Sequence, residues 1–466
     1  MEKVKQLDSS VSMPLHEYQE RAVQFCLEKK QAYLAMDMGL GKTRVSLELI
    51  RRTKTKALVV APLRGVHSTW PQECKKWTSE LTCNILHGSE KSFKKEADLY
   101  IINPEGMKWL YGELKKIYDK TGKLPFTTLI IDEGSMWKSS DTKRFDVMKA
   151  LLPVFTDYKL ILSGTPSPNS LMDLWSQYYL LDYGESLYEN AYRFRAKYFH
   201  QVDYNGFKYG LNDGADKQIY ERIAPRTFRL DAKDYLDMPD IIHNSISVEM
   251  PATCRVAYSK LESEFFMEFE EGRVDAFNSA SLSSKLRQFI QGGLYYAPEE
   301  GQERMYQPIH RVKLDALRDL MDEHVGEPIL CAIQFRFELD MLRQAFPDAP
   351  VIVGGCSATE SARAIDSWNC GDIPLLICHP ASLSHSVNLQ TGGHIVLWYG
   401  LPWSLEHYQQ LNARLYRQGQ QHAVIIHHLV MEDTIDEAIM KALAAKDKTQ
   451  SSLLNYLREY HHEQVD

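Results

Sequence analysis

A glycine-bearing segment behind an apolar run near the start of the chain is the first candidate for chemistry. Gly39 and Gly41 are followed directly by Lys42 and Thr43. Backbone N–H groups at such a strand-to-helix turn bind phosphate, while the lysine neutralises phosphate oxygens and the hydroxyl holds Mg²⁺. The usual pattern is G-x-x-x-x-G-K-[ST], and Met36 occupies the position of its first glycine. A plain glycine-bearing helix start is the alternative interpretation.

Two further strand ends carry side chains that suit an ATP site. Asp132 and Glu133 end the run "TLIID", where an aspartate can hold Mg²⁺ and a glutamate can orient and deprotonate the attacking water. Ser163, Gly164 and Thr165 follow another apolar run and could bond the acidic loop, so that they report the state of the γ-phosphate. Alone, each segment is more typical of an ordinary turn. After a phosphate loop in the same α/β unit, the catalytic interpretation of the acidic pair becomes the better one.

A distant segment, "HYQQLNARLYRQGQ" at 407–420, carries Gln410, Arg414 and Arg417. Residues four apart share a helical face, so we expect Gln410 and Arg414 on one face and Arg417 one turn later. Guanidinium groups supplied by a second domain stabilise charge on the γ-phosphate, an effect on the order of a thousandfold or more in rate. A surface helix with two exposed arginines is the alternative.

Two stretches alternate short apolar runs with helical patterns and therefore predict two α/β units with buried parallel strands. The expected strands are "AYLAM" and residues 57–62, 99–104, 128–133 and 159–165 in the first unit, and 328–333, 350–355, 374–379, 394–399 and 423–429 in the second. Between these units, residues 171–235 are dense in aromatic and charged side chains, and residues 252–290 are helical in pattern. In "YRFRAKYF" we expect Tyr192, Phe194 and Phe199 to pack rather than stack on nucleic acid.

Composition limits the function classes further. The chain has 466 residues, which predicts two domains or three, and a net charge of −8, which disfavours nucleic-acid binding over the whole surface but permits a local basic channel. We find neither an export signal at the N-terminus nor an apolar run of membrane-spanning length. Eight scattered cysteines without a C-x-x-C pair predict a reducing cytoplasm and no zinc site.

Taken in order, these motifs resemble helicase superfamily two, and within it the Swi/Snf-like DNA-dependent ATPases. "DMGLGKT" is similar to the family's D-E-M-G-L-G-K-T, which also lacks the first glycine, and Gln19 in "LHEYQ" resembles the glutamine that reads adenine. "LSGTP" and "QLNARLYRQGQ" match as well. The nucleotide contacts that the resemblance and the motifs together imply are Gln19, Met38, Gly39, Leu40, Gly41, Lys42, Thr43, Arg414 and Arg417, with Mg²⁺ at Thr43 and Asp132.

The same resemblance implies contacts with DNA. Residues 59–77, "VVAPLRGVHSTWPQECKKW", resemble the segment that approaches one DNA strand, while 285–295 and 433–443 resemble helices of the second lobe. The expected DNA contacts are Pro62, Arg64, Trp70, Ser382, Ser384 and Asn388. This chain departs from the pattern in two places: Ser135 replaces a histidine that couples the ATP site to DNA, and residues 381–390 carry serines where the family has glycines.

The implied fold is α/β, with two RecA-like parallel-sheet lobes, helical protrusions and an ATP cleft between the lobes. We expect lobe 1 at 1–235 with a protrusion at about 167–230. We expect lobe 2 at 236–466, with a protrusion at about 250–305 and bracing helices at about 433–460.

The implied function is an ATP-dependent motor that translocates on duplex DNA and hydrolyses ATP, with Mg²⁺, when DNA stimulates it. A strand-separating DNA or RNA helicase is the alternative, and a catalytically decayed ATP-gated scaffold is a third hypothesis. We expect phosphate contacts of little sequence specificity, a cytoplasmic monomer without a membrane partner, and targeting by protein partners or DNA structure. The chain resembles the compact bacterial and phage-encoded members.

Overall fold

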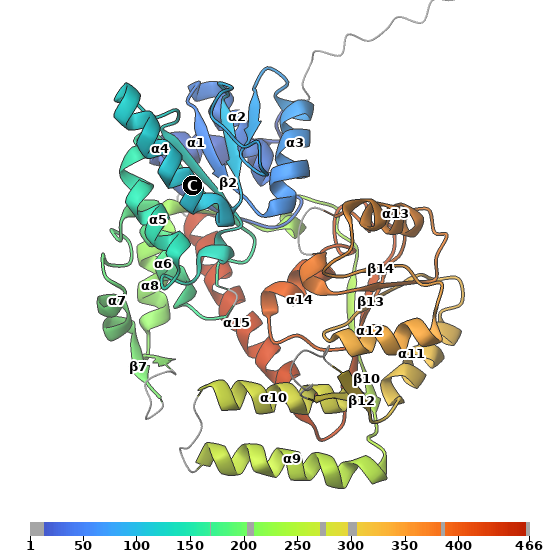
Figure 1. Cartoon of the computed structure of the whole chain (residues 1–466). Helices are drawn as coiled ribbons and strands as arrows, with labels where there is room; N and C mark the ends of the chain where they lie inside the picture. The colour runs from blue at the N-terminus through green and yellow to red at the C-terminus, as the bar shows by residue number, and fades with distance from the viewer. Residues whose placement is uncertain are drawn as a thin grey trace, which may run out of the picture. The chain divides into compact units, whose positions relative to one another are not determined.

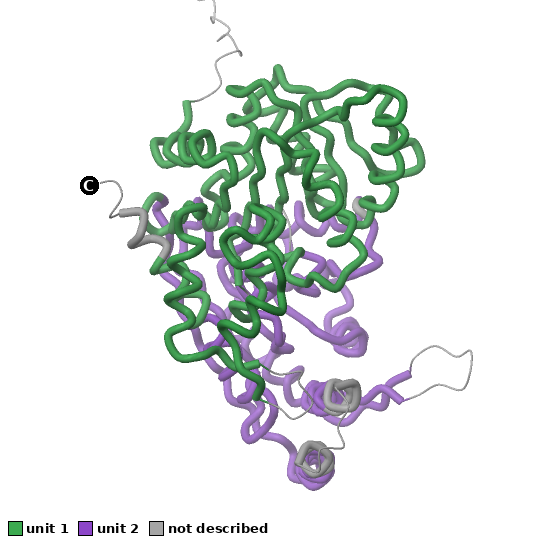
Figure 2. Tube along the Cα trace, turned by 90° about the vertical axis from the view of Figure 1, so that its left-hand side faces the viewer, with its two compact units in different colours: residues 1–235, 449–466 green, residues 236–448 purple. Residues whose placement is uncertain are grey.

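The chain divides into two compact units (Figure 2). Each unit is built on its own parallel sheet. The computed structural model describes residues 14–167, 169–202, 209–270, 276–296, 305–383 and 387–462. Unit 1 contains the described residues up to Tyr235 together with those from Thr449 onward, and unit 2 contains Leu236–Lys448. The two parallel sheets confirm the α/β class with two RecA-like lobes.

The sheet of unit 1 has seven parallel strands in the order β3-β4-β2-β5-β6-β1-β9. Its strands are β1 (Gln31–Met36), β2 (Ala57–Val60), β3 (Cys83–Ile85), β4 (Leu99–Ile102), β5 (Thr128–Asp132), β6 (Lys159–Ser163) and β9 (Thr227–Leu230). Strands β1, β2, β4, β5 and β6 are the predicted apolar runs, and they are buried almost throughout. The sequence did not predict β3, which is short and half-buried, or β9, which ends the aromatic-rich segment.

Eight α-helices accompany this sheet in the described residues up to Tyr235 (Figure 1). They are α1 (Glu17–Lys29), α2 (Lys42–Thr53), α3 (Trp70–Trp77), α4 (Met107–Thr121), α5 (Lys143–Leu151), α6 (Asp173–Asp182), α7 (Ala191–Tyr198) and α8 (Ala215–Ile223). Phe194 and Phe199 are buried in the core of unit 1, as expected. Tyr192 is 75% exposed, so the expectation that it packs is wrong. Because α7 begins at Ala191, Tyr192 lies in its first turn, on the face opposite the core.

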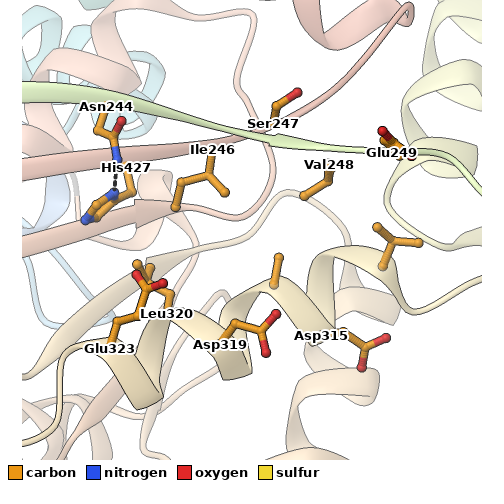
Figure 3. Close-up of a pocket in the computed structure, with 12 residues that line it drawn as sticks. Asn244, Ile246, Ser247, Val248, Glu249, Asp315, Asp319, Leu320, Glu323 and His427 are labelled. Atoms are coloured by element: carbon orange, nitrogen blue, oxygen red, sulfur yellow. Dashed lines mark hydrogen bonds between the residues drawn. The ribbon is translucent and has the colours of Figure 1, made fainter.

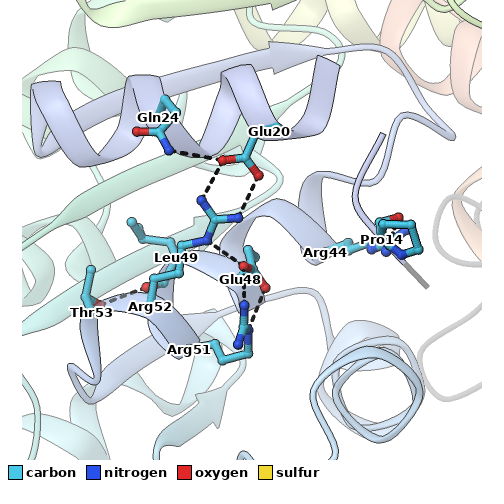
Figure 4. Close-up of polar contacts among 9 residues, drawn as sticks. All are labelled: Pro14, Glu20, Gln24, Arg44, Glu48, Leu49, Arg51, Arg52 and Thr53. Carbon is cyan, nitrogen blue, oxygen red and sulfur yellow. Dashed lines mark hydrogen bonds and ion pairs between the residues drawn. The ribbon is translucent and has the colours of Figure 1, made fainter. Parts of the chain in front are cut away.

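Charged side chains fix α2, the helix behind the candidate phosphate loop, to α1 (Figure 4). Arg52 lies 2.6 Å from Glu20 on α1 and 2.5 Å from Glu48 on its own helix. Hydrogen bonds from Arg52 and Gln24 lower the pKa of Glu20 to about 2. The pair is partly exposed, so its contribution to stability is on the order of 1 kcal/mol or less.

Unit 2 has a six-stranded parallel sheet in the order β10-β17-β16-β13-β15-β14. Its strands are β10 (Ile241–Val248), β13 (Ile329–Ala332), β14 (Val351–Ile352), β15 (Leu375–Cys378), β16 (Ile395–Trp398) and β17 (Val424–Met431). The last five are the predicted strands. The edge strand β10 is exposed along most of its length, so it has no buried run by which sequence could reveal it.

The helices of unit 2 include a pair that lies side by side, α9 (Ala252–Glu270) and α10 (Ala276–Ile290), next to the hairpin of β11 (Gly293–Tyr296) and β12 (Met305–Pro308) (Figure 1). The others are α11 (Val312–Glu323), α12 (Arg336–Ala345), α13 (Ala358–Asn369), α14 (Leu405–Asn412) and α15 (Ile435–His462). Lys313 and Asp436 form a fully buried ion pair of 2.7 Å that ties α11 to the start of α15. None of the described helices has the length and apolar character to cross a membrane.

The last helix, α15, contributes to both units. Its residues from Thr449 onward belong to unit 1. There, Leu453 and Leu454 are buried in the hydrophobic core, and the rings of Tyr220 and Tyr456 lie 5.5 Å apart. The core of unit 1 is therefore built from two segments that are distant in the chain.

Candidate nucleotide site

Three adjacent strands of unit 1 bring the first three candidate segments to one edge of the sheet. Strands β5, β6 and β1 are neighbours and run parallel, so their carboxyl ends meet, where ligands of open α/β sheets bind. A Cβ atom added to Gly164 would lie 3.5 Å from the Met36 carbonyl and 3.9 Å from the Met38 amide. The turn after β6 therefore packs against the loop after β1.

The glycines of that loop are required by its backbone. Gly39 and Gly41 have φ angles of 88° and 79°, which glycine adopts without the penalty of other residues. A Cβ at Gly41 would lie 2.4 Å from Gln19 Nε2, and Gln19, almost fully buried, donates from Nε2 to the Leu40 carbonyl at 3.2 Å. The expected adenine-reading glutamine thus contacts the loop directly.

Lys42 begins α2 and folds back over the loop. Its Nζ donates to the carbonyls of Met36 at 2.7 Å and Asp37 at 3.2 Å. Burial lowers the pKa of Lys42, and the carboxylates of Glu133, Asp132 and Asp37 oppose this effect. A phosphate group would give this ammonium a charged partner in place of two neutral carbonyls.

An ion pair that the sequence did not reveal, between a buried arginine and a partly exposed aspartate, joins the loop after β1 to β9. Arg229, on β9, lies 2.7 Å from Asp37 and donates to the Ala35 carbonyl at 3.0 Å. It also pairs with Asp231. The amide of Ala232 donates to Asp37 at 2.9 Å. Because these partners are far apart in the chain, no local pattern could have predicted the contact.

The first carboxylate of the acidic pair is held by a tryptophan. Trp70 Nε1 donates to Asp132 Oδ2 at 2.8 Å, and Trp70 is fully buried. Burial raises the pKa of Asp132, whereas the Trp70 bond, the charge of Lys42 and the Glu133 amide oppose this effect. The sequence had placed Trp70 among the DNA contacts; its burial leaves no ring surface for a base or sugar.

The second carboxylate, Glu133, has a strained backbone and two hydroxyl partners. Its φ is 64°, a left-handed conformation that costs a non-glycine residue about 1–3 kcal/mol and that is concentrated at functional sites. Ser135 Oγ donates to Glu133 Oε1 at 2.9 Å, and Ser163 Oγ lies 3.4 Å from the same oxygen. Ser135, the departure from the family's histidine, is thus a buried partner of the candidate base.

In unit 2 the structure corrects one expectation about the arginines. Helix α14 ends at Asn412, so Arg414 and Arg417 lie in the following turns and not on a shared helical face with Gln410. Arg414 Nε donates to the Gln410 carbonyl at 3.0 Å, which satisfies a carbonyl that the helix end leaves free. The side chain of Asn412 accepts from Trp398 Nε1 at 3.0 Å.

Arg417 is bonded to one of the expected DNA contacts. Its Nη1 donates to Asn388 Oδ1, and burial lowers the pKa of Arg417, although a guanidinium stays charged at neutral pH. Asn388 is exposed. The arginine and the segment at 381–390 are therefore physically linked within unit 2.

The remaining DNA candidates differ in accessibility. Arg64 and Ser382 are half-buried, and Pro62 is buried. Ser384 lies outside the described residues. Burial also lowers the pKa of Arg64.

A pocket of about 560 Å³ in unit 2 does not suit a phosphate-bearing ligand (Figure 3). The carboxylates of Asp315, Asp319 and Glu323 on α11 line it together with Glu249 and His427. No lysine or arginine is among its described lining residues. Since carboxylates repel polyanions, neither ATP nor a DNA strand belongs there.

The residues at the edge of unit 1 fit MgATP. The Thr165 hydroxyl is buried without a hydrogen-bond partner in the described part of the chain. No three His, Cys, Asp or Glu side chains of the described residues are placed to hold a metal by themselves. Mg²⁺ takes one or two protein ligands and completes its shell with phosphates and water, and Thr43 and Asp132 are the candidate ligands.

Comparison with known proteins agrees with this geometry. Residues 18–292 match the family model of the SNF2-related domain, and residues 312–419 match the helicase conserved C-terminal domain. The chain is 33% identical to "Putative protein p41" of Acyrthosiphon pisum secondary endosymbiont phage 1, over 95% of this chain and 98% of that protein. It is 23% identical to "Putative ATP-dependent helicase/translocase YwqA" of Bacillus subtilis, over 91% of this chain and 46% of that longer protein.

Among solved structures, the Sulfolobus solfataricus SWI2/SNF2 ATPase core in complex with dsDNA is 22% identical, with a TM-score of 0.43, and covers 98% of this chain and 97% of that chain. The matched domains define the class: an ATP-hydrolysing enzyme of helicase superfamily two. The chain belongs to the SNF2-related family of that class.

Proposed function

We propose that this ATPase is a motor that translocates on duplex DNA without separating the strands, and that duplex DNA stimulates its hydrolysis of ATP. The observation that carries the proposal is the edge of unit 1, where Lys42, after the loop that follows β1, lies near Asp132 and Glu133 at the end of β5. The curated relatives include a helicase/translocase of Bacillus subtilis and chromatin remodeling factors, and most of them are longer proteins, so their whole activity comes to this chain only as a proposal.

Each residue of the site has a proposed part in hydrolysis. Lys42 neutralises phosphate oxygens, and Glu133 orients and deprotonates the attacking water. Thr43 and Asp132 would hold Mg²⁺, which withdraws charge from the phosphates when bound. Ser163 shares Glu133 Oε1 with Ser135, so a change at the phosphates can reach the turn after β6.

The second unit supplies the proposed link to DNA. Arg414 and Arg417 would stabilise the charge that develops on the γ-phosphate. Asn388 accepts a hydrogen bond from Arg417. DNA that binds at 381–390 would therefore alter the hydrogen bond between Asn388 and the Arg417 guanidinium. This change would couple DNA binding directly to the rate of ATP hydrolysis.

We propose that lobe 1 ends near Tyr235, as predicted above, with protrusions at about 167–230 and 250–305; the described residues from Thr449 onward, predicted as part of lobe 2, group with unit 1. Helices α6 to α8 and the pair α9–α10 fall in these ranges. The partner is duplex DNA, contacted mainly at its phosphates through the segments around Arg64 and Asn388.

Phosphate release by the purified chain tests the ATPase assignment. We expect Lys42→Ala and Glu133→Gln to reduce turnover by at least about a hundredfold, and Glu133→Gln to keep ATP binding. Lys217→Ala and Glu221→Gln, both exposed on α8, serve as matched controls and should hydrolyse ATP normally. Near-normal turnover in Glu133→Gln would contradict the general-base assignment.

Two DNA assays separate translocation from unwinding. The rate of ATP hydrolysis, measured with duplex, single-stranded and branched DNA, should be highest with a substrate that contains duplex. We expect the protein to displace the third strand of a triplex when ATP is present. In the second assay, we expect the two strands of a forked duplex to stay paired. Displacement of a strand from the fork would favour the alternative, a strand-separating helicase.

A further inference from the structure

Helix α3 carries two tryptophans that both donate a hydrogen bond to a carboxylate, and only one of them is at the nucleotide site. Trp70, the first residue of α3, donates from Nε1 to Asp132 Oδ2 at 2.8 Å. Trp77, the last residue, donates from Nε1 to Glu73 Oε2 at 2.6 Å within the helix itself.

We propose that Trp70 is a positioning residue for Asp132, and that its indole N–H fixes the carboxylate in the orientation needed for Mg²⁺. The inference rests on the proposed ATP site. It replaces the expected DNA contact of Trp70 with a role inside the nucleotide site.

The surroundings of the bond explain why a single donor matters. Trp70 is fully buried, so its ring cannot turn away without leaving a large cavity. Asp132 ends β5, and its Oδ2 is taken by the indole. A carboxylate with one oxygen held in this way has a fixed orientation, and its other oxygen faces a metal ion in a defined direction. A hydrogen bond to a charged group is also among the stronger kinds in proteins.

Binding of a non-hydrolysable ATP analogue, measured by calorimetry with and without MgCl₂, tests the role without relying on turnover. For the unchanged chain we expect Mg²⁺ to tighten binding. In Trp70→Phe, which keeps an aromatic ring but lacks the donor, the Mg²⁺-dependent gain should fall about tenfold. Binding without Mg²⁺ should change little.

Trp77→Phe is the matched control, because it removes the same kind of bond from the same helix. It should keep the full Mg²⁺-dependent gain. Duplex DNA affinity without nucleotide should be equal in Trp70→Phe and the unchanged chain. A large loss of DNA affinity with a normal Mg²⁺ response would restore the DNA-contact assignment and overturn the inference.

A smaller change tests the same bond if Trp70→Phe fails to fold. Benzothienylalanine at position 70 keeps the bicyclic ring but carries sulfur in place of N–H, and the same loss of Mg²⁺-dependent gain is expected. An unchanged or larger gain in either variant overturns the inference and leaves the proposed ATPase intact. If the unchanged chain does not bind the analogue at all, the proposed function itself fails.

Discussion

At the scale of single residues, the acidic pair is fixed more firmly than its sequence suggests. Asp132 is held by Trp70, while Glu133 combines a left-handed backbone with hydroxyl partners from Ser135 and Ser163. Strain of this kind persists only where the surroundings determine the conformation. In this chain two serines therefore orient the candidate base, and one of them, Ser135, stands where the motif that the sequence resembles has a histidine.

The phosphate loop leads to a prediction about glycine. Gly41→Ala places a methyl group 2.4 Å from Gln19 Nε2 on a backbone with a φ of 79°, so Gln19 must leave its bond to Leu40. We expect ATP affinity to fall by about tenfold or more, measured by titration with a fluorescent ATP analogue.

The control for this change is Gly122→Ala. Gly122 has a similar φ of 65° at the end of α4, but nothing lies within 4 Å of the added Cβ. Strain alone should cost about 1 kcal/mol of stability there and leave ATP affinity unchanged. Equal losses of affinity in both variants would show that backbone strain, and not the clash with Gln19, is responsible.

The sequence predicted the residues that would contact the nucleotide, but not the contacts that hold these residues in place. The glycines, Lys42 and the acidic pair follow apolar runs, and parallel strands necessarily bring such ends together. The contacts of Trp70 with Asp132 and of Arg229 with Asp37 join segments that are distant in the chain, so no spacing rule encodes them. Which nearby carboxylate a tryptophan reaches is decided only by tertiary packing.

At the scale of elements, the buried runs were recognisable and the exposed or short strands were not. β2 and β4 are apolar throughout, and β5 and β6 are apolar in their central residues, because both sheet faces are covered, whereas β10 is an exposed edge. The predicted helix at 407–420 was wrong in its second half. Helical spacing permitted it, but the chain leaves the helix after Asn412, whose side chain bonds Trp398.

Two neighbouring helices predict opposite responses to pH. In α12, the buried Glu338 accepts from the amides of Gln334 and Phe335 at 2.6 and 3.1 Å, and burial raises its pKa to about 7. The folded state then holds a proton that the unfolded state releases near pH 4.5. The free energy of unfolding therefore falls as pH rises from about 4.5 to about 7.

Glu338→Gln should remove this pH-dependent decrease in the free energy of unfolding. Urea unfolding at pH 5 and pH 8 would then give a smaller difference in the free energy of unfolding than in the unchanged chain. The exposed Glu360 of α13 is the control, because the Ser357 amide and hydroxyl lower its pKa. Its contribution is present at neutral pH and is lost only as pH falls through its lowered pKa. Glu360→Gln should leave the difference between pH 5 and pH 8 unchanged.

At the scale of the whole molecule, the proposed motor requires both units to act on one nucleotide. Arg417→Ala tests this requirement, because the side chain belongs to unit 2 and the phosphate loop to unit 1. We expect turnover to fall about a thousandfold while ATP binding is retained, measured by phosphate release and by nucleotide titration on the same preparation. Arg363→Ala, an exposed arginine of α13, is the control and should behave normally. Unchanged turnover in Arg417→Ala would exclude this guanidinium from the reaction.

The path of α15 has a consequence for how the molecule is made. Leu453 and Leu454 complete the core of unit 1, yet they are translated after the whole of unit 2. During synthesis, the hydrophobic core of the N-terminal part of unit 1 stays incomplete until Leu453 and Leu454 emerge from the ribosome. A nascent chain is therefore exposed to proteases and chaperones for longer than its division into two units suggests. A stop codon shortly before Thr449 would leave the core of unit 1 without Leu453 and Leu454.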